Sequence, residues 1–534
     1  MKKGFTLIEL LAVIVILAII ALIATPLIMN VIDEAKRGSF ENSAYGIVKA
    51  AEITLATDIL SGNNNEVIIT YNNGQESSSN GKKLEYRGEK PKNGKIKINK
   101  NGEIAIVLHN GSHCAIKPYH LSKITVKRMN LNDCEFEKLI DDSGANAPIL
   151  VSGMIPIKWD SNNNEISTTE TDYDWYNYEQ KRWANAKSKD GSYWVWIPRY
   201  AYKIESGYHS STTGTIDVKF LKGVGNSTND GTTVESSGYK AGENDTSMKY
   251  FVHPAFQNDI NKYGFWVAKF EPSNSDGNIA VLPNVSSWRN VNIKNAYTVC
   301  KEMKDKKSIY GWKSEEVDTH MMTNHEWGAI AYLSKSQYGA PGEVWNNAYK
   351  EFKTGCSGTE VNSSILSTCI EYNTENGVKA STTHNIYGVY DMSGGSYEYV
   401  MGNYNNLVGS SGFADNNEVQ AINSYYITRY ETLISEMLEG VGMDYDERIY
   451  GDAIYETSIG VRYNGTDYVP REEGGKETGS WYGDYSYLPY LSSPWLYRGG
   501  HWNDGSGAGV FDFSNGTGIA NVNYSFRPVL APMK

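Results

Sequence analysis

An uninterrupted apolar stretch near the amino terminus constrains this chain more than any other feature. Residues 10–24 contain no polar side chain, and the apolar character continues, with few interruptions, to residue 32. A helix needs roughly 20 mainly apolar residues to cross the hydrocarbon core of a bilayer. Inside lipid the backbone has to satisfy its own hydrogen bonds, which favours a helix. We therefore expect residues 5–32 to form a membrane-spanning helix.

A single acidic residue, Glu9, lies at the start of this apolar stretch. An ionised carboxylate inside a membrane span costs about 2.5–3.5 kcal/mol, so it should have a partner. A secretory signal peptide and an ordinary membrane anchor are the alternative interpretations of the stretch. The acid at the start of the apolar core argues against a signal peptide.

The short basic leader, Gly4 and the segment FTLIE at residues 5–9 resemble the type IV prepilin signal. This resemblance implies that a prepilin peptidase cleaves between Gly4 and Phe5 and methylates the new amino terminus of Phe5. It also implies that Glu9 pairs with the amino group of a neighbouring subunit in a filament. Two buried opposite charges are tolerable together and costly apart. The expected partners are therefore other pilin subunits, the peptidase and the membrane.

The segment that follows predicts a helix continued to about residue 60 and then a small sheet. Glycine and three asparagines at residues 62–65 end the helical pattern. VIITY, KIKINK, EIAIVLH and KITVKRM then alternate apolar and polar residues, as strands do. A long helix packed on a small antiparallel sheet is the layout that the pilin resemblance implies. We assign residues 1–4 to a leader and residues 33–140 to the globular part of a pilin.

A chain of 534 residues is too long for one compact core, and about three domains are expected. The sequence DDSGANAPIL at residues 141–150 has the composition of a linker, which leaves residues 151–534 as an ectodomain. The net charge of −12 argues against a nucleic-acid partner. The basic leader favours a single-pass orientation in the bacterial cell membrane, with the rest of the chain outside and finally at the cell surface.

Five cysteines occur in a chain that is expected to be exported, where disulfides persist. Cys114 and Cys134 fall in one predicted domain, and Cys356 and Cys369 fall in another. We expect disulfides within those domains, Cys114–Cys134 and Cys356–Cys369, although spacing alone does not prove connectivity. Cys300, in a helix-like segment, has no expected disulfide partner, and we expect it to be a buried free thiol.

Four motifs in the second half of the chain resemble the formylglycine-generating-enzyme branch of the C-type-lectin fold. They are TNHEWG at 323–328, YGVYDMSGGSYEYV at 387–400, RGGHW at 498–502 and SFRP at 525–528. Similar domains, which are also called sulfatase-modifying-factor-like, usually serve in binding rather than catalysis. The resemblance implies a loop-rich domain, and the whole chain is then expected to belong to the α+β class.

The motif residues also have a structural interpretation. Arg498 and Arg527 can bind carbonyls or carboxylates bidentately and so fix loops. Gly499 and Gly500 allow a close approach of the backbone or a positive φ. Phe526 is expected to anchor the core. We therefore predict a scaffold role for all five residues.

Several observations argue against catalysis. The true formylglycine generator holds copper with two cysteines near its carboxy terminus, whereas the last cysteine here is Cys369. The sequence contains no GxSxG, HExxH, P-loop or CxxC motif. Two acidic pairs, Asp391 with Glu398 and Asp504 with Asp512, could serve a glycosidase, but we expect them to brace loops or face solvent. We predict no enzyme activity and no cofactor, while the fold resemblance allows a structural calcium ion.

The combined interpretation is a minor type IV pilin or pseudopilin, placed at a filament tip or sparsely, that displays a ligand-binding domain for adhesion. Its ligand would be a glycan or a protein. Aromatic side chains in the carboxy-terminal loops suit stacking on sugar rings, and the predicted ligand-binding residues are Trp481, Trp495, Tyr497, Trp502 and Asp504. The alternatives are a membrane-tethered surface enzyme on the same fold, a structural pseudopilin of a secretion or DNA-uptake system, and a surface receptor that is never processed as a pilin.

Overall fold

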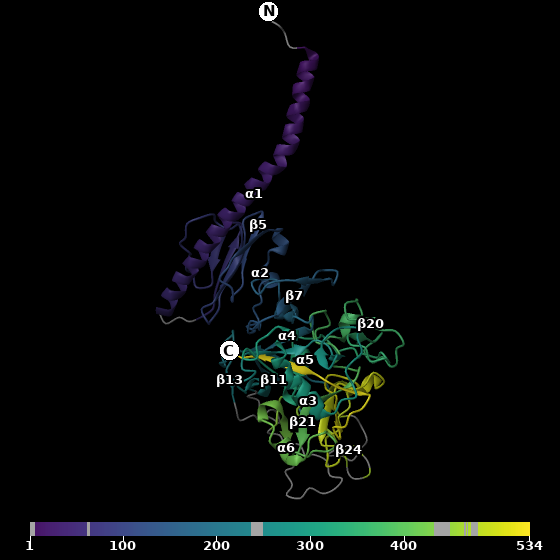
Figure 1. The fold of residues 1–534 in the computed structure, drawn as a ribbon. Helices are drawn as coiled ribbons and strands as arrows, with labels where there is room; N and C mark the ends of the chain where they lie inside the picture. Colours follow the sequence, from purple (N-terminus) through teal and green to yellow (C-terminus); the bar gives the residue numbers. More distant parts are fainter. Residues whose placement is uncertain are drawn as a thin grey trace, which may run out of the picture. The chain divides into compact units, whose positions relative to one another are not determined.

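The protein is described by a computed structural model that covers residues 6–60, 65–236, 249–431, 449–463, 466, 468–470 and 479–533. The chain forms two compact units, Met1–Ile140 and Asp141–Lys534. Figure 1 shows a long helix with a sheet in the first unit and a larger group of sheets, helices and loops in the second.

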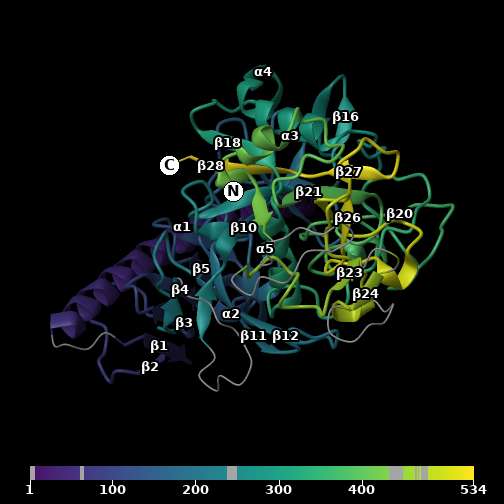
Figure 2. The same ribbon diagram turned by 90° about the horizontal axis from the view of Figure 1, so that it is seen from below.

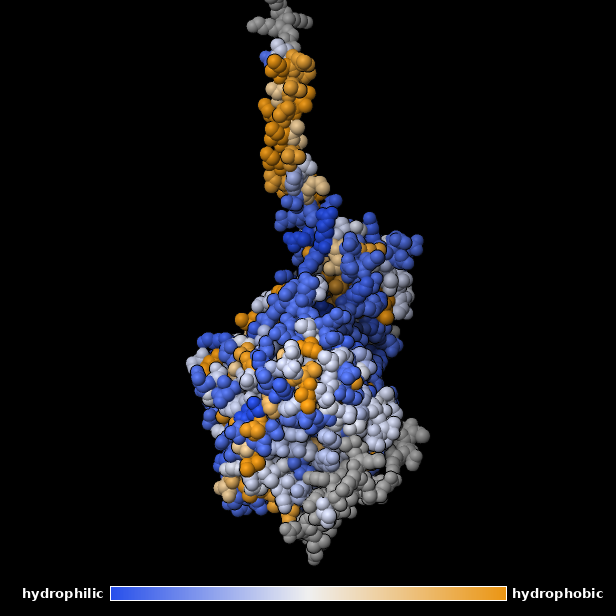
Figure 3. Space-filling model, turned by 90° about the vertical axis from the view of Figure 1, so that its right-hand side faces the viewer, coloured by the Kyte–Doolittle hydropathy of each residue, from blue (hydrophilic) through white to orange (hydrophobic). Residues whose placement is uncertain are grey.

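Helix α1 (Leu7–Leu60) dominates the first unit. Its amino-terminal half is apolar and exposed, and Figure 3 shows this half as a nearly continuous orange surface. Within the part of the chain that the structure describes, α1 is the single helix that is long and apolar enough to cross a membrane. Pro26 lies inside the helix without ending it. The predicted apolar amino-terminal helix is therefore confirmed.

The second half of α1 packs on a six-stranded antiparallel sheet. Phe40, Ala44, Ile47 and Ala51 are fully buried at spacings of four, three and four residues, which place them on one helix face. The strand order is β2-β1-β3-β4-β5-β6. The strand bounds are β1 Val67–Asn72, β2 Gln75–Ser78, β3 Asn93–Ile98, β4 Ile104–His109, β5 His113–Lys117 and β6 Thr125–Arg128.

A disulfide ties the end of the first unit to its sheet. Cys114 on β5 is bonded to Cys134, which lies between η1 (Leu131–Asp133) and α2 (Phe136–Leu139). Phe136 and Ile140 are buried in the same segment. The bond therefore holds the two short helices η1 and α2 against the sheet.

The main sheet of the second unit has seven strands in the order β18-β28-β15-β10-β9-β7-β8. Its central strands are buried on both faces, and β10 and β15 carry Trp194, Trp196 and Trp266 in the core. The strand bounds are β7 Ile155–Trp159, β8 Glu165–Ser167, β9 Asn185–Lys187, β10 Tyr193–Pro198, β15 Gly264–Ala268, β18 Val317–Met321 and β28 Pro528–Pro532.

A second sheet in this unit, β22-β21-β25-β26, carries the candidate site, and β27 pairs with β21 outside that order. Figure 2 shows β21, β26 and β27 near one another. The bounds are β21 Tyr397–Tyr404, β22 Thr428–Tyr430, β25 Trp495–Arg498, β26 Phe513–Gly516 and β27 Tyr524–Phe526.

The remaining strands form a four-stranded sheet and three hairpins. They are β11 Tyr200–Ser206, β12 Thr215–Phe220, β13 Val234–Glu235, β14 Tyr250–Val252, β16 Ser273–Ser275, β17 Asn278–Ala280, β19 Cys356–Ser357, β20 Ile370–Glu371, β23 Val461–Tyr463 and β24 Tyr468–Pro470.

Among the described residues of the second unit, two helices of more than two turns pack against its sheets. Helix α3 spans Ile293–Glu302, and α5 spans Asn324–Lys335. Helix α5 begins with a complete capping box in which the Thr323 hydroxyl accepts from the Glu326 backbone and the Glu326 carboxylate accepts from Thr323. Two shorter helices are α4 Lys307–Tyr310 and α6 Asn416–Gln420.

The observed architecture is α+β, with a long amino-terminal helix followed by sheet-rich structure, as predicted. The second unit pairs Cys356 with Cys369, and Cys300 is a buried free thiol. Burial raises the pKa of the Cys300 thiol well above its ordinary value, which keeps it in the unreactive neutral form.

Candidate ligand-binding site

The predicted processing point between Gly4 and Phe5 lies outside the described residues. Glu9, close to it, is exposed at the start of α1. Its carboxylate accepts a hydrogen bond from the Thr6 backbone at 2.9 Å and one from the Thr6 hydroxyl at 2.8 Å. The Thr6 hydroxyl accepts from the Glu9 backbone at 3.3 Å in return. This reciprocal pair is a capping box, so the acid has a local partner in the single subunit.

One face of the second sheet is built from tyrosines. Glu398 and Arg498 are opposite each other in the register of β21 and β25, and Arg498 is opposite Phe513 on β26. These three side chains are fully buried on the inner face. Because side chains alternate between the two faces of a strand, their neighbours point to the other face. That other face carries Tyr397, Tyr399, Tyr485, Tyr487, Tyr497 and Tyr524, and we call it the tyrosine face.

The strand register brings the tyrosines of the central strands together. Tyr497 is directly opposite Tyr399 on one side and Ser514 on the other. Tyr397 is directly opposite Tyr524 on β27. Directly opposed residues share one face of a sheet. These four tyrosines therefore form one continuous group on three adjacent strands.

Two further tyrosines extend the face beyond β26. Ser486 forms a β-bridge with Phe513, and Tyr485 and Tyr487 exchange backbone hydrogen bonds of 2.8 and 2.9 Å with that residue. Ser486 is buried, whereas Tyr485 and Tyr487 are only half-buried. The alternation places both tyrosines on the outer side, beside Ser514.

The rings of the tyrosine face contact one another in two groups, the four on β21, β25 and β27 and the pair Tyr485–Tyr487. Neighbouring ring centroids lie between 4.7 and 6.3 Å apart, a spacing typical of favourable aromatic pairs. Tyr399 is 1% exposed and forms the base of the group, while the other five tyrosines are half-buried. The result is a rigid aromatic layer that carries hydroxyl groups.

Asp504 supplies a carboxylate at this layer. It is half-buried and accepts a hydrogen bond from the His501 backbone at 2.8 Å. Burial raises the pKa of Asp504 above its ordinary value. Burial and then the charge of Asp504 also raise the pKa of Tyr397 and of Tyr485. The carboxylate is therefore within electrostatic reach of tyrosines at both ends of the face.

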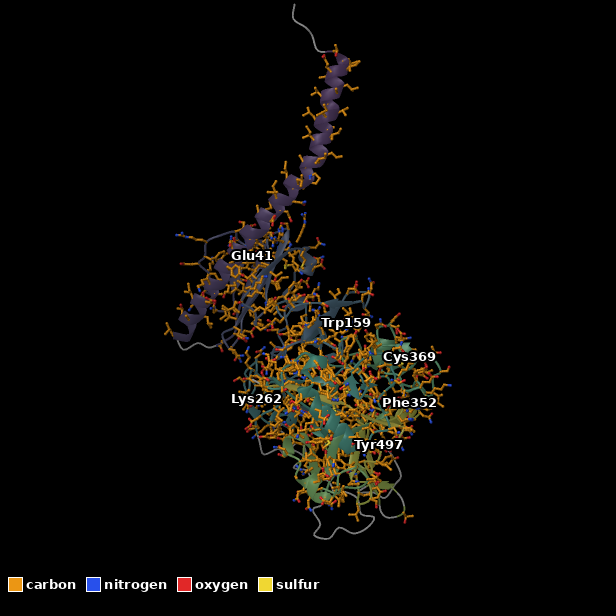
Figure 4. All side chains as sticks on the ribbon, in the orientation of Figure 1. Glu41, Trp159, Lys262, Phe352, Cys369 and Tyr497 are labelled. Carbon is orange, nitrogen blue, oxygen red and sulfur yellow. A yellow bond between two sulfur atoms is a disulfide. The ribbon has the colours of Figure 1, made fainter. Side chains whose placement is uncertain are left out.

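Other aromatic side chains line one edge of the layer. The His501 ring stacks on Tyr397 with centroids 5.3 Å apart, and Trp502 contacts His501 at 4.9 Å. Phe352 contacts His501 at 5.3 Å, and the Arg289 guanidinium lies 3.8 Å from the centre of the Phe352 ring. Tyr497 and Phe352 are labelled in Figure 4.

Beneath the tyrosine face, Arg527 connects separate parts of the second unit. Its guanidinium donates to the Glu398 carboxylate at 2.8 Å, to the Ala268 carbonyl at 2.8 Å and to the Tyr390 carbonyl at 3.0 Å. Arg498 donates to the Ala453 carbonyl at 3.3 and 3.4 Å. Both guanidinium groups are fully buried. Such fixed multidentate bonds hold loops that have little regular structure.

The two glycines of the RGGHW motif adopt backbone conformations that side chains oppose. Gly499 has φ 85° and Gly500 has φ 76°. A Cβ atom at Gly500 would lie 2.5 Å from the Cα atom of Ala508. The turn that follows β25 therefore needs glycine for both its conformation and its packing.

The first acidic pair, Asp391 and Glu398, is bonded inside the fold. Asp391 accepts from the Gly355 backbone and from the Asn347 amide, both at 2.9 Å, and Glu398 binds Arg527. Of the second pair, Asp512 is 1% exposed, and Asp504 is half-buried at the tyrosine face. Asp391 and Glu398 thus brace the fold, and Asp504 is the most accessible of the four carboxylates.

A buried histidine carries a further charge. His320 on β18 contacts Asp318 through Nδ1 at 2.7 Å and Glu326 through Nε2 at 2.8 Å. Burial by itself lowers the pKa of His320, but the Glu326 and Asp318 carboxylates outweigh it and raise the pKa to about 10. Tyr426 donates to the second oxygen of Asp318 at 2.8 Å. The imidazolium therefore links β18, α5 and the loop before β22.

The prediction of Trp481 and Trp495 as ligand-binding residues is wrong, because both side chains are fully buried. Their indole nitrogens donate to the carbonyls of Gly207 at 2.9 Å and Val408 at 3.1 Å. They anchor loops from the inside. Of the other three predicted residues, Tyr497 and Asp504 belong to the tyrosine face and its carboxylate, and Trp502 lies at its edge.

Most of the face was not predicted from the sequence, namely Tyr397, Tyr399, Tyr485, Tyr487 and Tyr524. A signal was present, since YEY at 397–399 and YSY at 485–487 have the period of two that places both tyrosines on one face of a strand. Within the described residues, no group of three or more His, Cys, Asp and Glu side chains is arranged to hold a metal ion.

Comparison with known proteins identifies a known motif at the amino terminus. Residues 1–25 match the family model described as the prokaryotic N-terminal methylation motif. A search of curated proteins found no match for the chain. The matched segment and the long apolar helix α1 together establish a type IV prepilin motif at the start of the chain, which supports a pilin or pseudopilin that assembles with other subunits after processing by a prepilin peptidase.

Proposed function

We propose that this chain is a minor, non-enzymatic type IV pilin or pseudopilin that presents a ligand-binding domain at the cell surface. The matched methylation motif, followed directly by the exposed apolar half of α1, carries the proposal. The apolar half first anchors the subunit in the membrane and then lies in a filament core. The size of the second unit favours a sparse or terminal position, because some 390 residues would crowd a shaft.

Processing would change the surroundings of Glu9. In the single subunit its carboxylate accepts from the backbone and hydroxyl of Thr6. Cleavage before Phe5 creates a positively charged amine, and Glu9 pairs with that group of an adjacent subunit. Thr6 offers the carboxylate only neutral donors, whereas the amine carries a full positive charge, so assembly would give Glu9 a partner of opposite charge.

Filament incorporation tests this part of the proposal. The variant Glu9→Gln keeps the shape of the side chain and removes its charge, and we expect its incorporation to fall at least about tenfold. The matched control is Glu34→Gln, an exposed acid on the same helix beyond the apolar stretch. Mass spectrometry of purified filaments should find a subunit that begins at methylated Phe5. Wild-type incorporation of the Glu9 variant would refute the assembly role.

For the second unit we propose the formylglycine-generating-enzyme-like form of the C-type-lectin fold. Support comes from the buried motif residues, since Arg498, Phe526 and Arg527 are at most 1% exposed. An experimental structure of the whole subunit tests this assignment by its strand order. A recognition role without catalysis is supported by Asp391 and Glu398, which are committed to bonds inside the fold.

The tyrosine face is the proposed ligand-binding surface. It combines half-buried rings, hydroxyl groups and the Asp504 carboxylate on a rigid sheet, a combination that suits recognition because few torsions are lost on binding. The double variant Tyr485→Ser/Tyr487→Ser should abolish adhesion of cells to their target surface while filament number stays unchanged. The control Tyr425→Ser alters an exposed tyrosine on η6 (Ser424–Tyr426), outside the face. Unchanged adhesion of the double variant would remove the face from the proposal.

A further inference from the structure

We propose that the tyrosine face binds an uncharged polysaccharide, whose sugar rings stack on the tyrosines and whose hydroxyl groups donate to Asp504. This inference rests on the proposed recognition function and specifies its ligand. Three observations support it: the shape of the face, the Asp504 carboxylate within the face, and the net negative charge of the second unit.

The shape of the face suits an extended chain of rings. Its tyrosines lie on four of five adjacent extended segments, the fifth being β26, which contributes Ser514. Adjacent strands are about 4.8 Å apart, so the row of side chains is about 19 Å long. A row of this length running across the strands can accommodate several consecutive rings of a linear polymer. Tyrosine rings offer apolar faces to sugar C–H groups, and their hydroxyl groups offer hydrogen bonds.

Asp504 determines which polar groups the ligand can carry. Its carboxylate accepts hydrogen bonds from the His501 backbone and the Tyr397 side chain, and it retains further acceptor capacity, because an ionised carboxylate has about four acceptor positions. Tyr397 and Tyr485 lie within its electrostatic reach. A ligand that donates hydrogen bonds, as sugar hydroxyls do, complements this acceptor. A carboxylate, sulfate or phosphate on the ligand would be repelled by it.

The net charge of the second unit also disfavours acidic polymers, in addition to Asp504. Residues 141–534 contain 32 Lys and Arg against 48 Asp and Glu, a net charge of −16. Residues 384–534, which contain all six tyrosines of the face and Asp504, have 8 basic against 19 acidic residues. A potential of this sign keeps anionic polymers away and leaves neutral ones unaffected. We therefore expect binding to depend little on salt.

Binding of the full-length subunit in detergent to immobilised polysaccharides tests the inference. The probes are uncharged polymers (β-glucan, mannan and chitin oligomers) and acidic polymers (polygalacturonate and hyaluronate). We expect binding to at least one uncharged polymer, with less than about twofold change between 0.05 and 0.5 M salt. Tyr485→Ser/Tyr487→Ser should weaken it at least about tenfold and Asp504→Asn about fivefold, while Tyr425→Ser should have no effect.

Three results would overturn the inference. They are binding to acidic polymers alone, binding to uncharged polymers that the tyrosine variants leave unchanged, and no binding to any polysaccharide by a folded subunit. Its failure can be separated from that of the proposed function by measuring cell adhesion in parallel. Adhesion that needs Tyr485 and Tyr487 without polysaccharide binding would keep the recognition function and assign it a protein ligand.

Discussion

The buried imidazolium of His320 provides a quantitative test of the energetics of the second unit. The side chain is 1% exposed and lies between Asp318 and Glu326, at 2.7 and 2.8 Å. The pKa of His320 is raised to about 10 in the folded protein, compared with 6.5 for an ordinary histidine. The variant His320→Gln lacks the imidazolium charge. We predict that it is strongly destabilised at pH 6 and much less so at pH 9.

The magnitude follows from the difference in pKa. One pKa unit corresponds to about 1.4 kcal/mol, so a difference of about 3.5 units contributes about 5 kcal/mol to the free energy of unfolding. Removing one member of a buried ion pair typically costs about 3–5 kcal/mol, which is consistent with that value. Since the folded pKa is the higher one, the contribution is complete below pH 6.5 and disappears as the pH rises through 10. About 3 kcal/mol of it should be lost between pH 6 and pH 9.

Urea unfolding of the full-length subunit in detergent measures this contribution. All 13 tryptophans lie at residue 159 or beyond, so tryptophan fluorescence reports on the second unit alone. The difference in free energy of unfolding between wild type and His320→Gln is compared at pH 6 and pH 9, which cancels other titrating groups. The control is His384→Gln, because burial lowers the pKa of His384, the opposite direction to the shift of His320.

The expected result is a stability difference that shrinks by about 3 kcal/mol from pH 6 to pH 9, with no such change for the control. Equal differences at both pH values would refute the reasoning, since they would mean that folding does not raise the pKa of His320. The contacts with the two carboxylates would then be ordinary hydrogen bonds.

Three further predictions follow from the second unit. Burial lowers the pKa of His325 to about 4, so the folded protein resists its protonation, and stability measured by the same fluorescence assay should fall as the pH decreases from 6.5 toward 4. Gly500→Ala should lower the free energy of unfolding by at least about 2 kcal/mol, because φ is 76° and the new Cβ would meet Ala508, whereas alanine at Gly505, which has open space, should cost about 1 kcal/mol. Replacing Cys356 and Cys369 by serine should cost about 3 kcal/mol, as expected for a disulfide that closes a short loop, and an unchanged urea midpoint would contradict this value.

The sequence by itself determined the features that depend on local or one-dimensional patterns. The apolar run fixed the position of α1, because only a helix satisfies the backbone over such a length in lipid. Alternating residues predicted most of β1 and β3 and all of β4 and β6 in the first sheet. These signals are local because the interactions responsible for them join residues that are close in sequence.

Only the tertiary structure decided which aromatic side chains are accessible. Trp481 and Trp495 occur in the same kind of loop-rich sequence as Tyr485 and Tyr497, yet the tryptophans are buried and the tyrosines form the outer face of a sheet. The reason is that β21, β25, β26 and β27 come from segments up to 129 residues apart, joined beneath the face by the Arg527–Glu398 contact. Trp495 and Tyr497 are two residues apart on β25 and share one face, so no local pattern separates them. The segment with Val408 and Phe413 packs on Trp495 and leaves Tyr497 accessible.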